Sequence, residues 1–108
     1  MDVYRRPLLP SLCPQTNRAE RLITIALVQT RWLEDPHAHR QQLGSGVATA
    51  AHQGASIVFL PELTLSRYPA DKRPEGRADA TAEPLVGGPT HLMAHELAQA
   101  NDVLVHAS

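Results

Sequence analysis

The chain has 108 residues, of which 43% are hydrophobic and 19% charged, and its formal net charge is -1. This length suits one small domain and is too short for two, and the composition is that of an ordinary globular protein. So small a net charge gives no clustered excess of Lys and Arg for binding nucleic acid. Cys13 is the only cysteine, so an intrachain disulfide is excluded and a reducing, cytoplasmic compartment is expected.

The first 20 residues show no periodic structure. They carry Arg5, Arg6 and Arg18, and their only apolar segments are short pairs such as Leu8-Leu9. A signal peptide needs a longer apolar stretch, and no run in the sequence approaches the roughly 18 apolar residues of a membrane span. We therefore expect residues 1–20 to be a disordered leader, and we expect no membrane partner.

Periodic structure begins with an almost continuously apolar run, Ile-Thr-Ile-Ala-Leu-Val, at residues 23–28. Such a run predicts a strand buried on both faces, as in a parallel sheet. A helix start follows, with Asp35 as N-cap and Pro36 at the first helical position. His37 and His39 flank this start and are expected to be solvated.

Apolar residues then recur at helical spacing, and Gly54 is placed to end the helix in the left-handed conformation. The inner face is formed by Leu43, Val47, Ala50 and Ala51. Gly44 and Gly46 should weaken the helix by about 1 kcal/mol each relative to alanine. Residues 57–60 (Ile-Val-Phe-Leu) predict a second buried strand, which completes a right-handed βαβ unit.

Residues 63–87 have no clear period and contain three prolines as breakers. A loop of that length in a compact domain is usually functional. Gly88, Pro89 and Thr90 then open a second helix, whose inner face is formed by Met93, Leu97 and Ala100. Residues 103–105 begin a third strand. The predicted fold is α/β with the order β-α-β-loop-α-β. Because its sheet edges and faces are uncovered, we expect the chain on its own to aggregate or to form a molten globule.

Glu62 is the candidate functional residue. Pro61 cannot donate to a sheet ladder, so it ends the pairing of the second strand and presents Glu62 just beyond the carboxyl end. Ligand crevices form at that position in open α/β sheets. Beneath a long loop the carboxylate would be partly desolvated and suited to act as a general base, whereas by position alone a solvated loop glutamate is the commoner case.

Residues 54–68 (GASIVFLPELTLSRY) resemble the first signature of the nitrilase superfamily of carbon–nitrogen hydrolases. That signature has a helix ending in Gly-Ala, an apolar strand, Pro-Glu-Leu, then a small hydroxyl residue and an aromatic. Residues 25–29 are also similar to the family's first strand. The resemblance covers residues 21–108 and implies the N-terminal part of a truncated four-layer α-β-β-α sandwich.

The family uses a Glu-Lys-Cys triad to hydrolyse small amides, carbamoyl compounds or nitriles, with no cofactor. The resemblance implies that Glu62 is the general base that activates a cysteine nucleophile and later a water. Cys13 precedes the first strand, and Lys72 lies ten residues after Glu62 without the family's lysine motif, so neither inherits a role. We expect hydrolysis, and the family's usual homo-oligomer, in a full-length parent, and no activity from the 108-residue chain alone.

The main alternative is a truncated or degenerate α/β protein that binds a ligand or partner without chemistry; an unrelated doubly wound module is a third. His91 and His95 are four residues apart with Asp102 on roughly the same side, but they lie opposite the inner helix face, so we expect no metal site. Arg67 and Tyr68 either line the mouth of the pocket or pack on the long loop. The residues alone leave both readings open.

Overall fold

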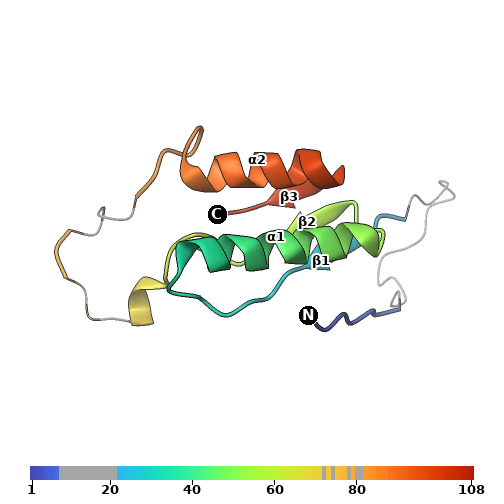
Figure 1. Ribbon diagram of the computed structural model, residues 1–108, viewed down its shortest axis with the longest axis horizontal. Coiled ribbons are helices and arrows are strands. Elements are labelled where there is room, and N and C mark those ends of the chain that lie inside the picture. The colour runs from blue at the N-terminus through green and yellow to red at the C-terminus, as the bar shows by residue number, and fades with distance from the viewer. Residues whose placement is uncertain (8–21, 72, 74, 78, 80–81) are drawn as a thin grey trace, which may run out of the picture.

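The structure is a computed structural model that describes residues 1–7, 22–71, 73, 75–77, 79 and 82–108. Figure 1 shows two helices lying along one side of a small sheet. The elements in chain order are β1 (Ile25–Leu27), α1 (Pro36–His52), β2 (Ile57–Phe59), the 3₁₀ helix η1 (Pro69–Asp71), α2 (Pro89–Asn101) and β3 (Leu104–His106). The predicted α/β class and order of elements are therefore confirmed.

The three strands form one parallel sheet in the order β1-β2-β3. In the register, Ala26 lies beside Val58, and Val58 lies beside Val105. Parallel pairing places the carboxyl ends of all three strands at the same edge of the sheet. The chain leaves the middle strand, β2, at this edge, and Glu62 follows it closely.

Helix α1 begins as the sequence predicts. The Asp35 side chain accepts a hydrogen bond of 3.0 Å from the backbone N–H of His37, and Pro36 is the first helical residue. This cap satisfies one of the donors that a helix start leaves without a partner. Gly54, with φ of 85°, takes the left-handed conformation just after the helix. Three of the predicted inner residues are buried, namely Leu43, Val47 and Ala50, and Ala51 is half-buried.

The two glycines inside α1 lie where the helix approaches other elements closely. A Cβ on Gly46 would lie 2.6 Å from Cγ1 of Val28, which is too close for real atoms. A Cβ on Gly44 would lie 3.4 Å from Cδ2 of Leu97 in α2, at the near limit of ordinary contact. Gly46 is therefore required for the helix to lie against the end of β1, a role that its low helix propensity alone does not reveal.

Helix α2 begins at Pro89, after Gly88 as N-cap, as predicted. Gly88 provides no side-chain cap, and the Glu83 carboxylate accepts a hydrogen bond of 3.1 Å from the backbone N–H of Thr90 instead. Met93 is buried and Leu97 packs against the core. Ala100, predicted to lie on the same inner face, is exposed, so that prediction is wrong.

The two faces of the sheet differ. Alternate strand residues pack with both helices in the core, with Val58 fully buried at the centre. The other face carries Ile25, Leu27, Ile57, Phe59, Leu104 and His106, and no described element covers it. The expectation that residues 23–28 are buried on both faces is therefore wrong, since Leu27 is 76% exposed.

Most of the predicted leader, residues 8–20, lies outside the described residues. Within residues 1–7, the Arg5 guanidinium donates a hydrogen bond of 3.0 Å to the carbonyl oxygen of Gln53, just after α1. The predicted loop at residues 63–87 contains η1 as its only helix or strand in the described part. Among the described residues, no helix has the length and apolar character needed to cross a membrane.

Candidate functional site

Glu62 follows the middle strand at the carboxyl edge of the sheet. The pairing of β2 continues one residue past the strand, where the backbone N–H of Leu60 donates to the carbonyl oxygen of His106 at 2.9 Å. Pro61 has no N–H to continue the ladder. The chain therefore turns at this point, and Glu62 lies on the turn, as the sequence predicts.

The turn at residues 61–64 is tight and closed by its own hydrogen bond. The hydroxyl of Thr64 donates to the carbonyl oxygen of Pro61 at 2.9 Å. Leu63 has a φ of 54°, in the left-handed region that side chains other than glycine rarely adopt. Such strained residues persist only where the surrounding structure holds them, and they are enriched at functional sites.

Thr64 connects this turn to two other parts of the molecule. Its side chain is almost completely buried, and its carbonyl oxygen lies 2.9 Å from Nε2 of His39 in α1. Its backbone N–H donates to the carbonyl oxygen of Ser108 at 2.6 Å, and its hydroxyl accepts from the N–H of Ser108 at 3.2 Å. The Glu62 turn is therefore held both by α1 and by the segment that follows β3.

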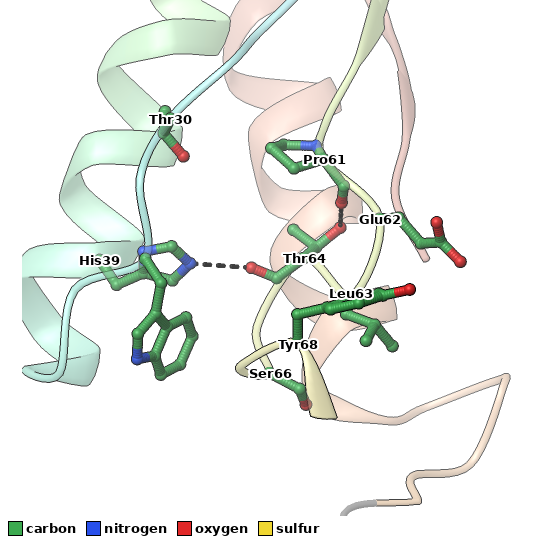
Figure 2. Close-up of a pocket in the computed structure, with 9 residues that line it drawn as sticks. Thr30, His39, Pro61, Glu62, Leu63, Thr64, Ser66 and Tyr68 are labelled. Atoms are coloured by element: carbon green, nitrogen blue, oxygen red, sulfur yellow. Dashed lines mark hydrogen bonds between the residues drawn. The ribbon is translucent and has the colours of Figure 1, made fainter. Parts of the chain in front are cut away.

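A cavity of about 230 Å³ lies beside the turn. Thr30 and Trp32 line it from the segment before α1, and His39 lines it from α1. The rest of the lining comes from the turn itself and from Ser66 and Tyr68 just after it. Figure 2 shows these side chains around the hydrogen bond between His39 and Thr64. The cavity combines aromatic rings with hydroxyl groups, and Glu62 borders it from the turn, a lining suited to a small molecule with polar groups.

The Glu62 side chain is exposed. In Figure 2 its carboxylate points away from His39, on the far side of the turn. The partial desolvation expected for this carboxylate is therefore not provided by the described residues.

Of the two residues expected at the pocket mouth or on the loop, Tyr68 lines the cavity and is 55% exposed. Arg67 is half-buried and is not part of the lining. Cys13 and Lys72 both lie outside the described residues. Glu62 is the one carboxylic acid among the residues that line the cavity in the described structure.

His91 and His95 are exposed, as expected, and their rings stack nearly parallel with centroids 6.4 Å apart. The N–H of Gly87 donates to Nδ1 of His91 at 3.2 Å. Asp102 ends α2 in the left-handed conformation. Within the described ranges, no group of three or more His, Cys, Asp or Glu residues is placed to hold a metal ion.

His39 lines the cavity, and its surroundings differ from those expected from the sequence. It was expected to be solvated, but it is 5% exposed, and the Trp32 ring packs on its imidazole with centroids 4.6 Å apart. The available signal was its spacing, because His39 lies four residues before Leu43, on the same helical face as Val47. His37, two residues before His39 and therefore on the opposite side of the helix, is exposed as expected.

Comparison of the chain with protein-family models, curated proteins and solved structures finds no match. The likeness to the nitrilase superfamily therefore rests on the motif around Glu62 and on the order of the elements. Chemically, the arrangement presents one carboxylate at the carboxyl edge of a parallel sheet, on a strained and well-anchored turn beside a small cavity.

Proposed function

We propose that this chain is the N-terminal part of a carbon–nitrogen hydrolase in which Glu62 is the general base. The observation that carries the proposal is the placement of Glu62 on the turn that directly follows the middle strand, beside the cavity. A base needs a fixed position relative to the proton that it removes. The hydrogen bonds of Thr64 to α1 and to the segment after β3, together with the bond to Pro61 that closes the turn, support that rigidity.

The proposal includes a second sheet, supplied by a longer protein that contains this chain. The uncovered sheet face is apolar, with Ile25 and Leu27 more than half exposed. A second sheet packed on this face would give the four-layer α-β-β-α sandwich that the sequence resemblance implies. It would also carry the lysine and the cysteine of the triad, since neither Lys72 nor Cys13 has the sequence context for those roles.

In the proposed reaction, Glu62 accepts the proton of the cysteine thiol. The thiolate forms a bond to the carbon of a small amide, carbamoyl compound or nitrile, and the lysine stabilises the charge on the tetrahedral centre. With an amide, the C–N bond breaks, the amine leaves with the proton, and an acyl thioester remains. Glu62 then takes a proton from water, and the water oxygen forms a bond to the thioester carbon. The C–S bond breaks, the carboxylic acid leaves, and Glu62 returns the proton to the cysteine sulfur. No cofactor takes part, and a homo-oligomer is the proposed assembly.

Replacing Glu62 tests this proposal in the longer protein. Glu62→Gln keeps the shape and removes the proton acceptor, so turnover should fall by about 10²–10⁴-fold while the fold persists. Glu62→Asp should also be impaired, because the carboxylate is withdrawn by one methylene. Steady-state hydrolysis of a panel of small amides and nitriles, with circular dichroism to check the fold, measures both effects.

Matched controls come from the two residues that have no assigned role. Cys13→Ser and Lys72→Ala should leave turnover nearly unchanged, and the 108-residue chain alone should hydrolyse nothing. Unaltered turnover in Glu62→Gln, or a large loss in Cys13→Ser, would overturn the assignment.

The second candidate function is ligand binding without chemistry. It is favoured by the exposure of Glu62 beside a cavity with polar lining. In that case a small amide would bind to the intact protein without turnover, and Glu62→Gln would weaken binding alone. Calorimetric titration run beside the hydrolysis assay separates the two functions.

A further inference from the structure

The imidazole of His39 is the one side chain of α1 that is hydrogen-bonded to the Glu62 turn in the described structure. His39 lies in the first turn of the helix and is separated from Thr64 by 25 positions in the sequence. Its Nε2 lies 2.9 Å from the carbonyl oxygen of Thr64, and both residues are buried. Two segments far apart in the chain are thus joined at the residue that closes the turn.

The chemistry of the two partners fixes which nitrogen carries the proton. A carbonyl oxygen can only accept a hydrogen bond, so Nε2 of His39 must be the donor. In the neutral ring, Nδ1 then carries no proton. Nδ1 is buried and has no hydrogen-bond partner among the described residues, and the Trp32 ring packs against the imidazole. The ring is therefore held in one orientation by packing on one side and by one hydrogen bond on the other.

We propose that His39 is a positioning residue, which holds the Glu62 turn against α1 and so fixes the place of the Glu62 carboxylate. It acts through Thr64, because Figure 2 shows the carboxylate of Glu62 pointing away from His39. Leu63, between Glu62 and Thr64, is in the left-handed conformation, and an anchor at Thr64 helps to keep it there. Only the catalytic consequence of this role rests on the proposed hydrolase function.

A direct acid–base role for His39 does not fit the same geometry. A group that transfers protons must present a nitrogen within reach of the substrate. Nε2 is committed to Thr64, and Nδ1 has almost no accessible surface. The ring borders the cavity without offering it a free nitrogen.

Two substitutions test whether the hydrogen bond to Thr64 matters, or only the presence of a polar side chain at position 39. The amide nitrogen of His39→Gln can reach the place of Nε2 and donate to Thr64, whereas the shorter side chain of His39→Asn cannot. Hydrogen exchange of the backbone amides at residues 64–66, measured on the full chain, should be about tenfold faster in the Asn variant. The Gln variant should stay within about threefold of the native chain.

Exchange of the Val58 amide in β2 and the far-UV circular dichroism show whether a variant is still folded. If His39→Asn unfolds as a whole, ¹⁵N chemical shifts of the native imidazole decide the matter, because they report which nitrogen carries the proton. A proton on Nε2 together with native-like exchange in His39→Gln supports the proposal. A proton on Nδ1, or equal exchange in a folded Asn variant and the native chain, overturns it.

The catalytic consequence is measured in the longer protein. His39→Asn should lower kcat about tenfold or more with little change in KM, and His39→Gln should restore most of it. The shape of the pH profile should be the same in all three proteins, since His39 transfers no proton. A limb lost from the profile in both variants would overturn the positioning role. Absence of hydrolysis in the native protein would refute the proposed function alone, because the exchange and chemical-shift results still test His39.

Discussion

The two faces of the sheet have similar apolar side chains and opposite surroundings. On the helix-covered face, Val58 is completely buried between α1 and α2. On the other face, Leu27 of β1 and Leu104 of β3 are 76% and 67% exposed. The difference shows that an apolar run identifies a strand with two apolar faces. Which of the two faces is buried depends on the elements that pack on each side of the sheet.

This contrast also explains how the site is built. The Glu62 turn is anchored on the helix-covered side, through His39 and Thr64. The carboxylate itself is exposed. A buried, hydrogen-bonded residue, Thr64, and an exposed carboxylate, Glu62, thus lie within three residues of each other. In the proposed sandwich, the layer packed on the uncovered face would complete the surroundings of Glu62.

The largest effect is expected in the core under α1. Leu43 is fully buried, and Leu43→Ala removes most of its side chain and leaves a cavity in the core. Such changes typically reduce the free energy of unfolding by about 2–5 kcal/mol. Urea unfolding followed by circular dichroism, at a concentration where sedimentation shows one species, measures the loss. A loss below about 1 kcal/mol would show that the helix-covered face is loosely packed.

A smaller effect, of opposite sign at two neighbouring positions, is expected from the glycines of α1. Gly46→Ala places a Cβ against the stiff Val28 side chain, and overpacking of this kind costs about 1–3 kcal/mol, partly offset by better helix propensity. Gly44→Ala meets only the flexible end of Leu97, so it should be neutral or stabilise by up to about 1 kcal/mol. Thermal or urea unfolding of the pair decides. Equal effects at both positions would contradict the close approach at Gly46.

Local signals explain what the sequence could predict. The start of α1 follows from Asp35 and Pro36, and its end follows from Gly54, because caps and breakers act within a few residues. The turn at Glu62 follows from Pro61 for the same reason. The three strands, their parallel direction and the place of Glu62 just after the second strand also follow from short-range patterns, whereas the exposure of one sheet face does not.

Long-range packing explains what the sequence could not predict. His39 is buried because Trp32 and Thr64 meet it from segments before and after α1. Glycine is needed at position 46 because the Val28 side chain occupies the place that a Cβ would take. Glu62 is exposed although it follows a buried strand, because no described residue covers its side chain. These features depend on residues in different segments of the chain, so the sequence pattern of a single helix or strand does not predict them.

The smallest effect is expected on the uncovered face, and it tests the contrast directly. Leu27→Thr keeps a residue that favours strands and removes exposed apolar surface. In the 108-residue chain it should change the free energy of unfolding by no more than about 0.5 kcal/mol, as for other surface positions, and it should weaken self-association in sedimentation velocity.

In a longer protein whose second sheet covers this face, the same substitution should cost about 2 kcal/mol or more, because a hydroxyl would then be buried in an apolar interface. An equally small effect in both proteins would show that nothing packs on the face and would remove the main structural support for the four-layer arrangement. A large effect in the 108-residue chain itself would show instead that the face is already covered there, as by association between copies.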